Sequence, residues 1–139
     1  MQLPEALRAR IAAEFRFAAS KMAETPDLGA KLYLFSALFG ELNRAFNQSW
    51  SPELGLANLV LKDVHQQISG RLSMPTLGTA IPPELPGALD DVAAELATLF
   101  ENKQIDDGRL FQILAKAATV GYAATGNGYY LYLKGQIRL

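Results

Sequence analysis

Leucine and phenylalanine recur at helical spacing along the first half of this chain. Three apolar stripes follow one another at steps of three and four residues, and none alternates with the period of two that is typical of a strand. The stripes predict three amphipathic helices, at about residues 4–24, 26–48 and 52–72. Their apolar positions are Leu7, Ile11, Phe15, Ala18 and Met22; Leu28, Leu32, Phe35, Phe39, Leu42 and Phe46; and Leu54, Leu61, Val64, Ile68 and Leu72.

Two of these helices have a clear start signal. Thr25-Pro26-Asp27 and Ser51-Pro52-Glu53 each offer an N-cap hydroxyl, a proline at the first helical position and an acidic residue in the first turn. The connection after the first helix is so short that helices one and two are expected to form an antiparallel hairpin. The second helix is the most apolar, so we expect it to be the central helix or to be half covered by another subunit.

Residues 73–87 interrupt the helical pattern. The stretch SMPTLGTAIPPELPG contains four prolines and two glycines, which predicts a long connection without regular helix. A fourth helix is expected from about Leu85 or Ala88 to Lys103, and Asp106 is expected to cap a fifth. Gly126-Asn127-Gly128 is expected to end or kink the fifth helix. The inward positions are predicted to be Leu89, Val92, Leu96, Leu99 and Phe100, then Leu110, Ile113, Leu114, Ala117, Val120 and Ala124.

The predicted fold class is therefore all-α, an antiparallel bundle of four to five helices with one long proline-rich connection. We interpret residues 1–139 as a single domain, with three front helices at 4–72 and two back helices plus a tail at 88–139. The tail YYLYLKGQIRL fits either a short helix or a strand, and helix is favoured because the rest of the chain offers no partner strand.

Composition narrows the class of protein. Half of the 139 residues are apolar and none is cysteine, which removes disulfides, thiolate metal sites and cysteine nucleophiles. The first ten residues, MQLPEALRAR, contain no apolar run, so we expect no signal peptide, and the longest uncharged run, 117–133, is too polar to span a membrane. We expect a cytoplasmic protein.

Charge is unevenly distributed along the second half. Residues 108–139 contain only basic charges, in contrast to the acidic stretch before them, so the two segments are expected to neutralise each other within one subunit or across a dimer. The acidic residues of 84–107 are Glu84, Asp90, Asp91, Glu95, Glu101, Asp106 and Asp107, against Lys103 alone.

The residues that several classes of enzyme require are missing from this sequence. With His65 as the only histidine, neither a carboxylate-bridged di-iron site nor a multi-histidine metal site can form within one chain. No Gly-x-Ser-x-Gly elbow and no phosphate-binding Gly-Lys-Ser/Thr loop is present. We expect no metal and no cofactor.

Two groups of residues remain as candidate sites. Glu41, Arg44 and His65 form either a small polar pocket within the bundle or an ordinary solvated face. The tail combines aromatic and basic side chains: its tyrosines either pack across the end of the bundle or bind a protein partner. Nucleic acid fits less well because the net charge is slightly negative. The candidate partner-binding residues of the tail are Tyr129, Tyr130, Tyr132, Lys134 and Arg138.

The leading hypothesis is a non-enzymatic interaction or scaffold module that self-associates, as a dimer, through the second helix, the tail or both. An alternative is a small enzyme or ligand-binding bundle that uses Glu41, Arg44 and His65. A third hypothesis is a nucleic-acid-associated subunit.

Overall fold

The computed structural model describes residues 1–74, 81–125, 134–136 and 138, and these form five α-helices and no strand. The predicted all-helical bundle is confirmed. A helix was favoured over a strand for the tail, 129–139, but of this segment only residues 134–136 and 138 belong to the described part of the chain. The helices are α1 (Glu5–Ala23), α2 (Leu28–Ser49), α3 (Pro52–Ser73), α4 (Leu85–Glu101) and α5 (Asp107–Ala123).

The start of α2 differs from its predicted cap. Asp27, not Thr25, is the N-cap, and its carboxylate accepts a hydrogen bond of 2.9 Å from the backbone N–H of Ala30. The Thr25 hydroxyl instead donates to the carbonyl of Lys21 at the end of α1. A carboxylate at this position satisfies a free N–H and also complements the helix dipole, so it outcompetes the hydroxyl two residues earlier.

The proline-rich connection is shorter than predicted. α3 continues through Ser73, and α4 already begins at Leu85 with Pro86 in its first turn, where a missing N–H is tolerated. Residues 75–80 lie outside the described part, as does the predicted stop at 126–128. α5 itself ends at Ala123.

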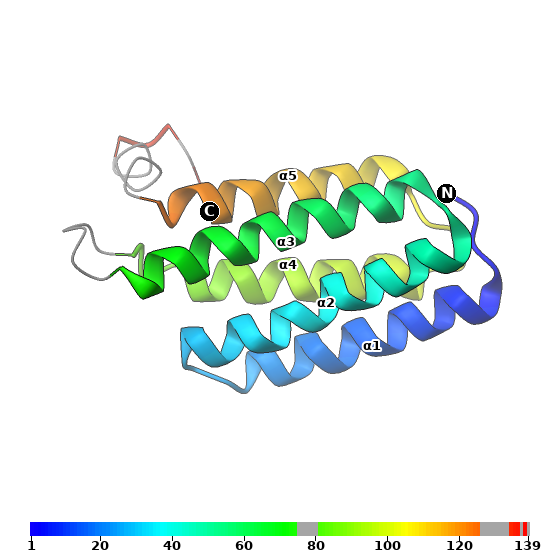
Figure 1. Ribbon diagram of the computed structural model, residues 1–139, viewed down its shortest axis with the longest axis horizontal. Coiled ribbons are helices and arrows are strands. Elements are labelled where there is room, and N and C mark those ends of the chain that lie inside the picture. Colours follow the sequence, from blue (N-terminus) through cyan, green and yellow to red (C-terminus); the bar gives the residue numbers. More distant parts are fainter. Residues whose placement is uncertain (75–80, 126–133, 137, 139) are drawn as a thin grey trace.

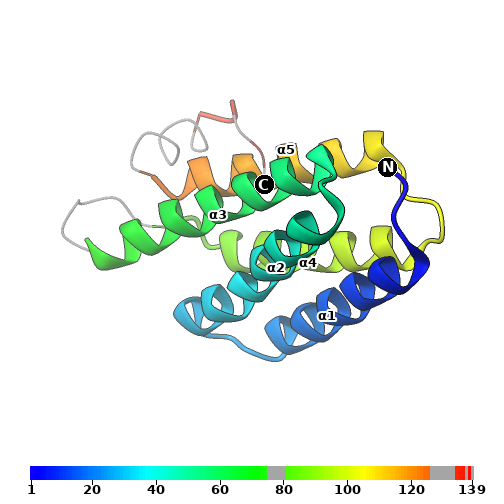
Figure 2. The ribbon, with the colours of Figure 1, turned by 45° about the vertical axis from the view of Figure 1, so that its right-hand side comes forward.

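The five helices pack as a ring in the order α1, α2, α3, α5 and α4, each in contact with its two neighbours (Figure 1). Neighbours run antiparallel except α3 and α5, which lie side by side and point the same way (Figures 1 and 2). A ring with an odd number of members cannot alternate in direction all the way round. One parallel pair is therefore a geometric necessity.

The predicted inward positions of α1, α4 and α5 are all buried, which confirms those stripes. Leu72 of α3 is exposed instead, because it lies in the last turn, beyond the covered part of the helix. α4 is more deeply buried than α2, with nine of its 17 residues buried against seven of 22. The expectation that α2 is the central helix is thus corrected, since α4 is the more buried of the two. The small side chains of Ala93 and Ala97 are fully buried on α4, which lets neighbouring helices approach it closely.

Gly121 sets the distance between the two parallel helices. A Cβ atom at this position would lie 3.0 Å from Oε1 of Gln67 and 3.1 Å from Cα of Val64. α5 therefore touches the backbone of α3 here, and the contact also fixes their relative register. Because the two helices run parallel, residues ten positions before this contact lie at the same height on both. Phe111 of α5 is therefore level with residues 54–57 of α3.

Candidate functional site

Glu41 lies in the seam between α1 and α2, with its side chain only 1% exposed. Its Oε1 accepts a hydrogen bond from Nε of Arg10 at 2.8 Å, and its Oε2 accepts one from Nη2 of Arg44 at 2.6 Å. Both carboxylate oxygens are thus bound by guanidinium groups. A carboxylate held in this way is a structural tie rather than a free general base.

His65 lies on α3 and faces a different side of α2. Its ring packs edge-on against Phe39, with 5.4 Å between centroids, and burial lowers the pKa of His65 below its usual value. Phe39 and Glu41 are two positions apart, which puts them on nearly opposite sides of α2. The structure therefore brings Glu41 and Arg44 together and does not join His65 to them.

The candidate residues of the tail are only partly described. Tyr129, Tyr130 and Tyr132 lie outside the described residues, and Lys134 and Arg138 are exposed. The geometry of this group is therefore no basis for a site.

The acidic and basic segments meet within the chain. Glu95 of α4 accepts hydrogen bonds from Arg109 at 3.1 Å and from Lys116 at 3.2 Å, both on α5. Lys116 also lies 3.9 Å from Asp91. For Arg109 and Lys116, the predicted neutralisation takes place within one subunit, so these two side chains need no acidic partner on a second subunit.

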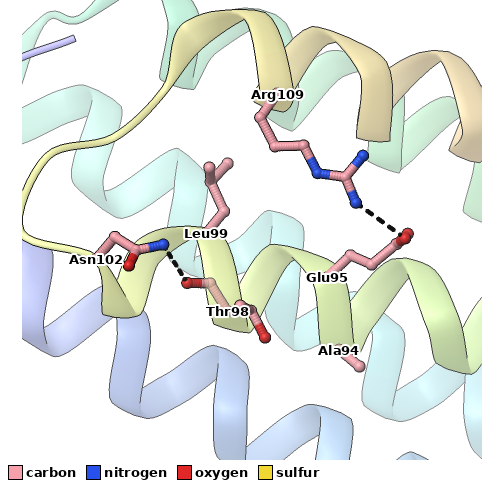
Figure 3. A pocket seen from close by; sticks show the side chains of 6 residues that line it. All are labelled: Ala94, Glu95, Thr98, Leu99, Asn102 and Arg109. Carbon is pink, nitrogen blue, oxygen red and sulfur yellow. Dashed lines mark hydrogen bonds and ion pairs between the residues drawn. The ribbon is translucent and has the colours of Figure 1, made fainter.

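A groove with a volume of about 270 Å³ runs between α4 and α5. Arg109 reaches over it from α5 toward Glu95, while Nδ2 of Asn102 donates to the carbonyl of Thr98 (Figure 3). The two charged groups of the groove neutralise each other, which leaves no free acid or base for catalysis. The groove is lined by Ala94, Glu95, Thr98, Leu99, Asn102 and Arg109.

Large apolar side chains are exposed on the neighbouring helices α3 and α5. Leu56 and Leu59 of α3 are 45% and 65% exposed, and Phe111 and Tyr122 of α5 are more than two-fifths exposed. The register set by Gly121 brings Phe111 level with Leu56, so the two side chains flank the same end of the α3–α5 seam. We call this surface the α3/α5 face. It comprises the exposed residues Leu56, Leu59, Lys62, Asp63, Gln66 and Gly70 of α3 and Phe111, Ala115, Ala118 and Tyr122 of α5.

The α3/α5 face carries very little charge. Arg109 is the only charged residue among the exposed positions of α5, and it is turned toward Glu95 of α4. On α3 the exposed charged residues are Lys62 and Asp63. An apolar surface with so few charges is the kind that proteins bury against a partner.

This surface is not the one expected from sequence. On α2, Tyr33 is 79% exposed and the C-cap residue Trp50 is 73% exposed, whereas Phe39 and Phe46 are partly buried against the core. Leu56, Leu59 and Phe111 were missed because they fall outside the buried stripes of their helices. A leucine or phenylalanine outside the apolar stripe of its helix is a sign of an exposed apolar side chain, and the sequence contained that sign. Only the packing of α3 beside α5 shows that these residues share one face.

Two classes of site find no support in the described part of the chain. No group of three His, Asp or Glu side chains gathers there in a way that could hold a metal ion. None of the described helices combines the length and the apolar character needed to cross a bilayer.

Comparisons with known proteins add no family to this picture: no family model, no curated protein and no solved structure matches the chain.

Proposed function

We propose that this protein is a non-enzymatic interaction module that self-associates through the α3/α5 face. The observation that carries the proposal is the exposure of Leu56, Leu59, Phe111 and Tyr122 on two adjacent helices whose exposed positions are nearly free of charge. The exposed part of each apolar side chain adds no stability to the monomer, whereas burying it between two copies is favourable.

The charge distribution supports an apolar protein partner over nucleic acid. A phosphate backbone binds through clustered lysine and arginine, and the α3/α5 face has Lys62 as its only cation, directly followed by Asp63. The two basic residues of α5, Arg109 and Lys116, lie outside this face and bind Glu95 of α4.

Sedimentation velocity over a range of concentrations tests the proposal. The wild-type protein should form a dimer at micromolar concentration, and Leu59→Asp should weaken the association by roughly tenfold or more, since it places a charge at the apolar contact. Phe111→Asp should act in the same direction.

Tyr33→Asp is the matched control, because it also replaces a highly exposed apolar side chain by a carboxylate, on α2. It should leave the dimer intact. Thermal melts of each variant separate loss of association from loss of folding. A wild-type protein that stays monomeric at its highest soluble concentration refutes the proposal, and a dimer broken only by Tyr33→Asp moves the interface to α2.

A further inference from the structure

Four exposed residues of α5 form one stripe along its outer side. They follow one another at steps of four, three and four residues, which keeps them within about 60° of one another around the helix. This is the spacing of a coiled-coil seam. The basic residues of α5 lie on another side of the helix, where they bind Glu95 of α4, so no charged residue belongs to the stripe. The stripe consists of Phe111, Ala115, Ala118 and Tyr122.

The stripe is symmetric in size about its midpoint, which lies between residues 116 and 117. The aromatic residues Phe111 and Tyr122 are each about 8 Å from this midpoint along the helix axis, and the alanines are each about 2 Å from it. A second α5 that runs in the opposite direction about a two-fold axis at this level places Phe111 beside Tyr122 of the second copy. In the same arrangement, Ala115 lies beside Ala118 of the second copy. The stripe is therefore complementary to a second copy of itself.

Small residues in the middle and large ones at both ends suit the geometry of two crossing helices. The distance between packed helices depends on the side chains at the contact, so the alanines allow a close approach at the centre. Because packed helices cross at an angle, the gap between them widens away from the crossing point. The aromatic pairs fill this wider space at each end of the contact.

The charge at the start of α5 favours the antiparallel direction over the parallel one. The exposed N-cap Asp106 and the helix N-terminus would lie beside their own copies in a parallel pair. In the antiparallel pair, the two copies of Asp106 are about 30 Å apart along the axis. Each positive end of the helix dipole then lies beside a negative end, which is the favourable arrangement.

We infer, on the basis of the proposed self-association, that two copies of this chain pack α5 against α5 in the antiparallel sense, about a two-fold axis level with the midpoint of the stripe. Leu59 of α3 is level with residues 113–116 in the register set by Gly121, so it flanks the centre of this contact.

Cysteine cross-linking tests the direction and the register, because the natural chain has no cysteine. Phe111→Cys and Tyr122→Cys are prepared as separate proteins and mixed. In a mixed dimer the two thiols meet at one end of the contact, and the aromatic pair at the other end stays intact. Mild oxidation of the mixture should therefore give a covalent dimer on a non-reducing gel. Phe111→Cys alone should stay largely monomeric on the gel, because its two thiols are about 16 Å apart along the helix axis, farther than a disulfide can span.

The size of the central residues provides the second readout. Ala118→Leu adds apolar surface at an exposed position, so it would strengthen a loose apolar contact. At the centre of a close α5–α5 contact it forces the helices apart instead, and it should weaken the dimer by about tenfold or more in sedimentation velocity. Ala13→Leu makes the same change at an exposed position of α1 and should leave the affinity within about threefold of wild type.

The outcomes separate this inference from the proposed function. The antiparallel α5–α5 contact is overturned if the wild-type protein dimerises but the mixed cysteine variants give no disulfide. Efficient cross-linking of Phe111→Cys alone, or an Ala118→Leu dimer as tight as wild type, also overturns it. Each of these results leaves self-association standing, whereas a monomeric wild-type protein removes both proposals.

Discussion

The two sides of this bundle are held together by different forces. Around α4, polar side chains bridge the helices: Arg16 of α1 binds Glu101 at 2.8 and 3.0 Å, and Lys31 of α2 binds Asp90 at 2.7 Å. α3 differs completely. Within the described residues, no hydrogen bond or ion pair joins a side chain of α3 to another helix. Its contacts are apolar and aromatic, as between His65 and Phe39.

This difference explains why the surfaces differ. Charged side chains on α1, α2, α4 and α5 serve as ties between helices, so they surround α4 with neutralised pairs. α3 is positioned by shape, through the close approach at Gly121 and the contact of Gly55 with the Phe46 ring. A helix that needs no polar ties can expose apolar side chains, and α3 does so at Leu56 and Leu59.

The buried pair of Lys31 and Asp90 is the strongest test of the polar side. Nζ of Lys31 is buried and also donates to the carbonyl of Met22, so Asp90→Ala leaves a buried ammonium with one neutral partner. We expect a loss of about 3 kcal/mol in the free energy of unfolding, measured by urea denaturation. Glu101→Ala removes an exposed pair and should lower it by about 1 kcal/mol or less. Equal losses would mean that burial does not distinguish the two pairs.

Gly121→Ala tests the packing of α3 by shape. The added methyl group meets the backbone of Val64, which cannot move away without separating α3 from α5. The free energy of unfolding should fall by about 1–3 kcal/mol. Gly40→Ala in α2 is the matched control: its Cβ meets no atom within 4 Å, so higher helix propensity should stabilise the protein by up to about 1 kcal/mol. A stabilising Gly121→Ala would show that the helices can separate freely.

The smallest expected effect is a pH dependence that distinguishes the two sides. Burial lowers the pKa of His65 below 6.5, so the unfolded chain takes up the proton first and stability falls as the pH drops below about 6.5. The hydrogen bond from Arg16 lowers the pKa of Glu101, whose contribution is present above pH 4.5 and is lost as the pH falls below it. Urea denaturation between pH 7 and 5 should show a slope that His65→Gln removes and Glu101→Gln leaves. A slope that persists in His65→Gln would assign it to another group.

Much of the local structure follows from the order of residues alone. The period of 3.6 in the apolar positions identified all five helices, and the phase of each stripe identified side chains such as Phe15, Val92 and Ile113 as buried. Both properties depend on residues within a few turns of each other, so a single sequence contains them. Helix ends were less accurate, as at Asp27, because neighbouring residues compete for the same capping role.

The neighbours of each helix were decided only by the tertiary structure. An apolar stripe shows which side of a helix is covered but not which helix covers it, so the parallel pairing of α3 with α5 was not predictable. The same holds for charges that pair over long distances in the chain, such as Lys31 with Asp90 and Glu41 with Arg10. Exposure of Leu59 and Phe111 on one surface arises from the closure of five helices into a ring. This shared exposure depends on how the side chains of all five helices fill the core together, and no local pattern along the chain encodes it.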